Sequence, residues 1–174
     1  MRPGGSAGGR RAAVSVVTPA ELAGHAFLRG LTGQQAASLA SVATAIAVPA
    51  GHRFFDEGGQ ATQFWLIRTG QVALDLQVPG RPRLIVETLG RGDELGLSWL
   101  SESLEWQLGA AAQVPTTAFE LDGPAVRGLC EQDCELGWEL ARRLLTVASG
   151  RLHAARIRLV DLYRGPDQES GSPR

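Results

Sequence analysis

The chain has 174 residues, with 17 basic and 18 acidic side chains and a formal net charge of −1. This length fits one domain with a full hydrophobic core, and the near-neutral charge excludes a general electrostatic attraction to nucleic acid or to anionic membranes. No apolar run of the sequence reaches the roughly 20 residues that span a bilayer. The two cysteines are too few for a disulfide framework, so we expect a reduced, cytoplasmic protein with no membrane partner.

The N-terminal part of the chain predicts a tail followed by two helices. Residues 1–17 are rich in Gly, Arg and Ala without a period and are predicted to be disordered. Thr18 to Glu21 combines a capping hydroxyl, a proline at the first helical position and an acid three residues on. Residues 32–35 open a second helix with Ala36, Leu39 and Val42 on one side. We expect both helices to cover one end of a barrel.

From residue 43 to residue 122 the apolar period changes towards two, which is typical of half-buried strands. Short apolar runs end in glycine or in the turn at residues 79–82, and both signals mark the corners of antiparallel strands. Short strands flanked by helices at both ends indicate an α+β domain with a closed or nearly closed antiparallel barrel. The strands are expected around Ile46 and Val48, Phe54, residues 64–67, 72–76, 84–88, 107–114 and 116–121.

Two helices are predicted to close the domain. Asp122 is placed to cap a short helix that runs through Cys130, and Asp133 to cap a long helix over residues 134–163. A Gly-Pro pair stops the long helix. The folded domain is therefore expected to cover residues 18–163, with a disordered tail at 164–174.

Apolar residues recur along the long helix at intervals of three and four, as in the a/d seam of a coiled coil. One interpretation is that this seam lies against the barrel. However, Leu140, Leu144, Ile157 and Val160 form a second apolar side that could cover the barrel instead. We therefore favour a parallel two-fold homodimer through the residues of the dimerisation seam, which are Trp138, Ala141, Leu145, Ala148, Leu152, Ala155, Leu159 and Leu162.

The glycine-punctuated segments at residues 51–58, 64–72 and 89–96 carry the most information about the fold. Their order resembles the cyclic-nucleotide-binding domain of the catabolite-activator (Crp/Fnr) type, over about Phe27 to Tyr163. The resemblance implies a jelly-roll-like antiparallel barrel with N-terminal helices and a long C-terminal helix, through which relatives dimerise. The transcription factors of this type continue into a helix-turn-helix domain. This chain ends shortly after Tyr163, so we expect no DNA binding by this chain alone.

The resemblance also locates a nucleotide-contact segment. The family's pattern reads roughly Phe-Gly-Glu-x-x-Leu and then Pro-Arg-Ser/Thr-Ala-Thr, in which the Glu binds the ribose and the Arg binds the phosphate. Apolar Leu97 stands at the Glu position and Trp106 at the Arg position. Removing one member of a buried charged pair costs about 2–5 kcal/mol, so we predict a degenerate site that disfavours cyclic nucleotide. Its family-equivalent residues are Leu95, Gly96, Leu97, Ser98, Trp99, Trp106 and Gln107.

Three interpretations of the two tryptophans remain open. They fill the nucleotide volume, which we favour, or they line a pocket for a neutral or planar ligand, or cyclic-nucleotide binding survives despite them. Nearby acids, namely Glu94, Glu102 and Glu105, would repel an anionic ligand. Arg91 is close in sequence, but its spacing does not indicate that it points inward.

Enzymatic and metal-binding functions are not supported by the sequence. His25, His52 and His153 fall in different predicted elements, and Cys130 and Cys134 lack further ligands nearby. No nucleophile–base pair or paired carboxylates emerge, so we expect no enzyme, no metal and no cofactor. The sequence predicts a non-catalytic regulatory module that binds a partner protein or an altered small ligand. The alternatives are a cAMP- or cGMP-binding signalling protein, part of a ligand-responsive transcription regulator, and a structural dimer adaptor.

Overall fold

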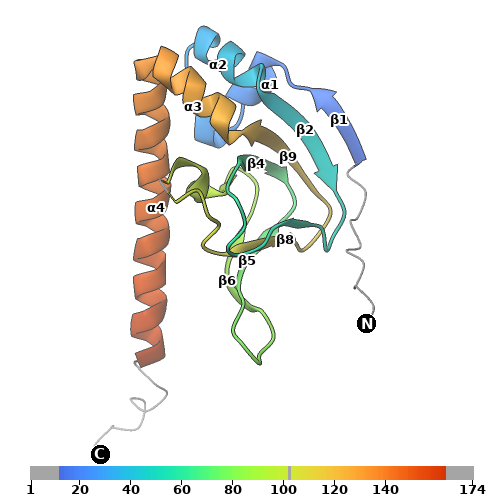
Figure 1. The fold of residues 1–174 in the computed structure, drawn as a ribbon, viewed down its shortest axis with the longest axis vertical. Coiled ribbons are helices and arrows are strands. Elements are labelled where there is room, and N and C mark those ends of the chain that lie inside the picture. The colour runs from blue at the N-terminus through green and yellow to red at the C-terminus, as the bar shows by residue number, and fades with distance from the viewer. Residues whose placement is uncertain (1–11, 102, 164–174) are drawn as a thin grey trace, which may run out of the picture. The chain divides into compact units, whose positions relative to one another are not determined.

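The structure, a computed structural model, describes residues 12–101 and 103–163. They divide into two compact units, with the boundary between Gly137 and Trp138. The first unit holds two antiparallel sheets with their helices, and the second is the long C-terminal helix from Trp138 onwards (Figure 1). The prediction of an α+β fold with antiparallel strands, N-terminal helices and a long C-terminal helix is confirmed.

The strands pair antiparallel in two sheets. The first sheet has the order β1-β2-β9-β4-β7 and the second has the order β3-β8-β5-β6. Both sheets draw on strands from distant parts of the chain, so each is held together by long-range pairing. The strand bounds are β1 Ala12–Val16, β2 Ala43–Val48, β3 Arg53–Phe55, β4 Gln63–Thr69, β5 Val72–Leu76, β6 Leu84–Leu89, β7 Glu94–Leu95, β8 Gly109–Ala112 and β9 Thr116–Asp122.

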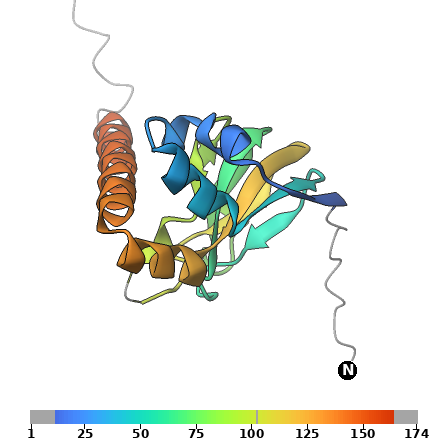
Figure 2. The same ribbon diagram turned by 90° about the horizontal axis from the view of Figure 1, so that it is seen from above.

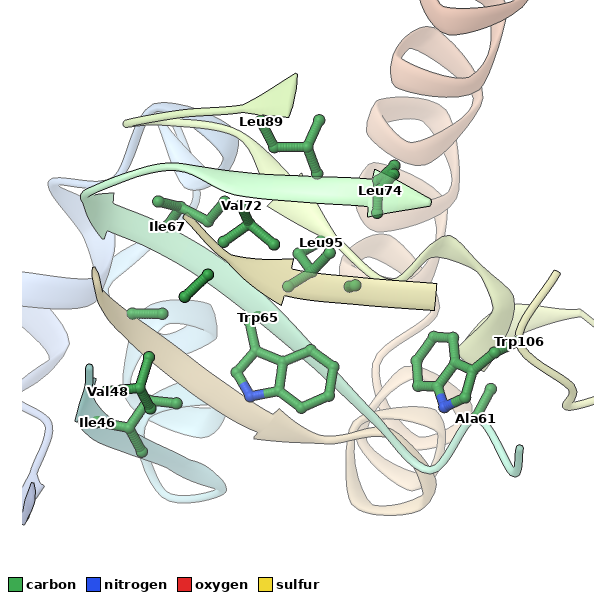
Figure 3. Packing of buried hydrophobic residues seen from close by; sticks show 13 residues of the cluster. Ile46, Val48, Ala61, Trp65, Ile67, Val72, Leu74, Leu89, Leu95 and Trp106 are labelled. Carbon is green, nitrogen blue, oxygen red and sulfur yellow. The ribbon is translucent and has the colours of Figure 1, made fainter. Parts of the chain in front are cut away.

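Strand β4 organises the interior because it lies between β9 and β7 and is buried on both faces. Its alternation sends Trp65 and Ile67 into the main hydrophobic cluster (Figure 3). Phe64 points the other way and stacks on Trp99. The indole N–H of Trp65 donates to Glu120 on β9 at 2.8 Å, so the buried polar atom is satisfied.

The N-terminal helices begin where their capping residues predict. They comprise α1 (Pro19–Ala23), the 3₁₀ helix η1 (Ala26–Leu28) and α2 (Gly33–Ala40), and they lie at one end of the sheets (Figures 1 and 2). Thr18 and Thr32 each form a complete capping box, with Glu21 and Gln35 respectively. These reciprocal hydrogen bonds satisfy backbone N–H groups that the helix itself leaves unpaired.

The two C-terminal helices also begin at the predicted caps. Asp122 accepts from the Ala125 N–H at 2.7 Å and opens α3 (Gly123–Gln132). Asp133 accepts from two N–H groups in the first turn of α4 (Cys134–Tyr163). None of the helices within residues 12–101 and 103–163 combines the length and the apolarity needed to cross a membrane.

The N-terminal segment differs from the sequence prediction. Residues 12–16 were expected to belong to a disordered tail, but they form β1 on the edge of the first sheet, with Val16 opposite Thr44 of β2. The pairing is long-range, so composition alone did not reveal it. The other predictions of disorder fall on residues 1–11 and 164–174, which lie outside the described residues.

A buried ion pair ties the second sheet together. The guanidinium of Arg53 on β3 donates two hydrogen bonds to the carboxylate of Asp75 on β5, and Arg83 donates a third at 3.0 Å. The Asp75 side chain is only 6% exposed. A β-carbon at Gly109 would overlap the Arg53 guanidinium, so β8 needs glycine at this position. Arg53 above all holds the pKa of the Asp75 carboxyl below its ordinary value.

We expect Asp75→Asn to lower the free energy of unfolding at neutral pH by about 2–3 kcal/mol, because it leaves Arg53 without its buried counter-charge. The folded-state pKa of Asp75 is depressed, so its stabilisation is present above the ordinary carboxyl value of 3.8 and is lost as the pH falls through the lower folded value. Urea unfolding at neutral and acidic pH measures both effects, and the variant should approach the wild type in acid. Exposed Glu105→Gln is the control, and an unchanged stability of Asp75→Asn at neutral pH would contradict the assignment.

Candidate functional site

The segment that the sequence predicts to match the family's nucleotide contacts includes Gly96, a glycine in a left-handed conformation. Gly96 has φ 102° and joins β7 to the 3₁₀ helix η2 (Leu97–Leu100). A β-carbon on Gly96 would lie 3.0 Å from Cη2 of Trp106 and 3.1 Å from its Cζ3. The position therefore requires glycine both for its φ angle and for the approach of the indole.

Trp106 is part of the hydrophobic core. Its side chain is 5% exposed, and its indole stacks on Phe55 with the ring centroids 3.9 Å apart and an interplanar angle of 14°. Figure 3 shows the Trp106 indole together with Trp65, and Ala61 beside it. The backbone of Trp106 is fixed as well, because it accepts from the Gly58 N–H at 2.8 Å and donates to the Gly59 carbonyl at 2.9 Å. The ring is thus held by both side-chain and backbone contacts.

The other matched positions do not supply a positive charge. Leu97 and Ser98 are half-buried in η2, and Leu95 is fully buried in β7. Gln107 is exposed, and its amide donates to the Glu105 carbonyl at 3.4 Å. The structure therefore brings Gly96 and Trp106 into contact, whereas Gln107 lies at the surface.

The two tryptophans of the segment belong to separate aromatic stacks. Trp99 is 1% exposed and stacks on Phe64, with centroids 4.5 Å apart, whereas Trp106 stacks on Phe55. Among the residues that the structure describes, the indole N–H of Trp99 has no acceptor within hydrogen-bonding distance. The two rings do not form the walls of one shared aromatic pocket.

Sequence reasoning missed three features of this region. Phe55 was not singled out, yet it supplies the stacking surface for Trp106. Arg127 on α3 donates to the Trp99 carbonyl at the end of η2. Leu104 has φ 49°, which is unfavourable for a residue with a β-carbon. The repeated aromatic pair at residues 54 and 55 was the available signal for the first of these features.

The charged residues near the segment are dispersed. Glu94 is buried in β7 at 1% exposure, Glu105 is exposed, and Glu102 lies outside the described residues. Arg91 is exposed and lines a separate cavity together with Arg29 and Arg68. Arg91 therefore does not take the place of the phosphate-binding arginine that the family pattern predicts at position 106.

The histidines and cysteines lie where the sequence placed them, in separate elements. His25 precedes η1, His52 precedes β3 and His153 lies in α4. Within the described part of the chain, no group of three or more His, Cys, Asp or Glu side chains could hold a metal ion. Cys130 and Cys134 are free, and burial raises the pKa of the Cys130 thiol.

The dimerisation seam is exposed in the single chain. Its large members have exposed fractions between 52% and 68%, and Ala141 and Ala148 are exposed too. Ala155 is half-buried, and the side chain of Leu162 lies outside the described residues. The second apolar side is divided, because Leu140 and Leu144 are buried whereas both Ile157 and Val160 are 49% exposed. The seam thus has the exposure of an unpartnered apolar surface.

Comparison with known proteins supports the fold. Residues 45–133 match the family described as the cyclic nucleotide-binding domain. A candidate cyclic nucleotide-binding protein from Geobacter metallireducens GS-15 has 24% identity and a TM-score of 0.71, over 79% of this chain and 99% of that chain. The catabolite activator protein of Thermus thermophilus has 24% identity and a TM-score of 0.63, over 79% of this chain and 63% of that chain. A search of curated proteins gave no match.

We expect Gly96→Ala to lower the free energy of unfolding by about 2–4 kcal/mol, because it combines a strained φ angle with a collision against Trp106. Gly51→Ala is the matched control. Gly51 has φ 81°, but its β-carbon would meet nothing within 4 Å, so this variant reports the conformational cost alone. Chemical denaturation of both variants gives the difference. Equal losses of stability would show that the close packing of Trp106 on Gly96 is unimportant.

Proposed function

We propose that this chain, which belongs to the cyclic nucleotide-binding domain family, is a non-catalytic regulatory module whose nucleotide pocket is occupied by its own side chains. The observation that carries the proposal is the burial of Trp106, at the position matched to the phosphate-binding arginine, in a stack with Phe55. The Trp106 indole fills space at the position where other members of the family place an arginine that neutralises the phosphate.

Two energetic terms oppose binding of a cyclic nucleotide in the usual way. The phosphate would meet no guanidinium at the matched position, at a cost of about 2–5 kcal/mol. The indole would also have to leave its stack, and removing a buried Trp side chain costs about 3–5 kcal/mol. Half-buried Leu97 offers no acceptor to the ribose hydroxyl. Together these terms favour a module that responds to a partner protein or to a different small ligand.

We further propose that the module is a homodimer through the dimerisation seam of α4. The exposed Leu and Trp side chains recur at heptad spacing, and the alanines between them allow two helices to approach closely. Leaving these side chains in water is unfavourable, by about 25 cal/mol per Å² of apolar surface. Association with a second copy would remove this exposure symmetrically.

The alternative function is a signalling protein that binds cAMP or cGMP, or the sensor part of a ligand-responsive transcription regulator. The similarity in fold to the Thermus thermophilus catabolite activator protein favours it. This alternative requires Trp106 to swing out of the core, because the ring occupies a buried position. The two functions therefore differ in a directly measurable property, the affinity of the unmodified chain for a cyclic nucleotide.

We expect isothermal titration calorimetry to detect no saturable binding of cAMP or cGMP by the wild-type chain up to about 1 mM. The double variant Leu97→Glu/Trp106→Arg restores both family ligands and should bind cAMP about 30-fold or more tightly than the wild type. Leu100→Glu/Trp106→Arg is the matched control, because it places the carboxylate on the exposed residue of the same 3₁₀ helix. Circular dichroism checks that each variant folds. Micromolar binding by the wild type would refute the filled pocket.

Light scattering should give the wild-type chain the mass of two copies, and Leu145→Arg/Leu152→Arg should give the mass of one, because two like charges would face each other across the seam. The control is Ile157→Arg, which adds a charge at an exposed position of α4 outside the seam and should leave the dimer intact. A single-chain mass for the wild type would rule out the dimer.

A further inference from the structure

A cavity lies in the first unit, apart from the segment predicted to match the nucleotide contacts. It measures about 390 Å³ and is lined by residues from α1, η1, β4, β9 and the turn between β6 and β7. Its volume is within the range of sites that bind small molecules. Three arginines, Arg29, Arg68 and Arg91, converge on it.

The three guanidinium groups come from separate segments of the chain. Arg29 follows η1, Arg68 lies near the end of β4, and Arg91 lies in the turn before β7. Within residues 12–101 and 103–163, none of the three forms an ion pair with a carboxylate within 4.0 Å. By contrast, arginines elsewhere in the structure do so. No direct ion pair among the described residues therefore neutralises the positive charge at this cavity.

The lining residue His25 is held by two hydrogen bonds and carries no charge. The His25 ring is buried, and its Nε2–H donates to the Ile67 carbonyl at 3.0 Å while Nδ1 accepts from the Phe27 N–H at 3.3 Å. Burial lowers the pKa of His25, so the ring is neutral at physiological pH. Beside it, the Arg68 guanidinium lies over the Phe119 ring, 4.7 Å from the centroid.

Two carboxylates lie near the arginines and leave the balance positive. Glu21 lines the cavity, but its carboxylate accepts from the Thr18 N–H at 3.0 Å and from the Thr18 hydroxyl at 2.7 Å. These bonds lower the pKa of Glu21, so it remains ionised. Asp93 accepts from the Gly90 N–H at 2.7 Å and lies close enough to influence His25 electrostatically. The three guanidinium groups thus outnumber the two carboxylates, those of Glu21 and Asp93. Each carboxylate accepts hydrogen bonds from its own segment of the chain.

We infer that the cavity lined by Arg29, Arg68 and Arg91 binds a small ligand that carries phosphate groups. Guanidinium groups bind phosphate oxygens through paired, charge-assisted hydrogen bonds. The exposed side chains of Ala20 and Ala26 offer a small apolar surface to the organic part of such a ligand. A concave site of this volume suits a small molecule better than an extended macromolecular surface.

Such a ligand would act on the turn that leads to the filled pocket. This turn is anchored to β4, because Gly92 N–H donates to the Ile67 carbonyl and the Ile67 N–H donates to the Asp93 carbonyl, both at 2.9 Å. Arg91 belongs to the same turn, and β7 leads from it directly to Gly96. Occupancy of the cavity would therefore connect the N-terminal helices to the segment that precedes η2 and would slow hydrogen exchange at residues 90–96.

The test uses inorganic pyrophosphate and ADP as probes, with calorimetry on the full chain at low and at moderate salt. We expect saturable binding by the wild type, weakened about tenfold or more by Arg68→Ala and by Arg91→Ala, and weakened by added salt. Arg81→Ala is the matched control. It removes the same charge from the turn between β5 and β6, outside the cavity lining, and should bind both probes as the wild type does.

Two results would overturn the inference. One is the absence of saturable binding of both probes by the wild type at low salt. The other is equal weakening by all three arginine variants, which would indicate general attraction of anions to the surface. Neither result depends on Trp106 or on cAMP, so this inference and the proposed function can fail separately.

Discussion

The stack of the Trp106 indole on Phe55 is the contact on which the interior of the first unit depends. It joins the segment after η2 to β3, and Phe55 also stacks on Trp65 of β4, with ring centroids 5.6 Å apart. Gly96 leaves room for the indole edge, and Gly58 and Gly59 bind the backbone of Trp106. Three segments thus fit around one ring, and the close packing of protein interiors leaves little freedom to move it.

The sequence predicted the parts of the fold that local chemistry determines. Helix starts at Thr18, Thr32, Asp122 and Asp133 depend on side chains within three residues of the cap, so they could be recognised from the sequence. The pairing of β1 with β2 depends on residues some thirty positions apart and was missed. The family resemblance predicted a jelly-roll-like antiparallel barrel but not the order of strands in the two sheets, because alternation alone does not determine which strands become neighbours.

The residues of the candidate site stay a prediction from the family resemblance, and the packing around them could not be predicted from the sequence. The family resemblance named Gly96 and Trp106 as positions of one site, and the structure shows that a β-carbon on Gly96 would lie 3.0 Å from the Trp106 ring, a contact that the sequence did not predict. Sequence spacing could not assign Trp99 and Trp106 to different stacks, because that depends on which side of β4 each ring reaches. It also could not show that Arg91 lines one cavity with Arg29 and Arg68, since these residues come together only through tertiary structure.

The fit of Gly96 against Trp106 has a consequence for the evolutionary history of this chain. An arginine at position 106 alone would leave a void beside Phe55 and a charge without a partner in the core, and a glutamate at position 97 alone would add a second unpaired charge. Each of these substitutions alone lowers stability. The two together would be useful only when an anionic ligand is present to bind them. On the proposed function, an evolutionary return to nucleotide sensing would therefore need both substitutions together, since either one alone costs stability.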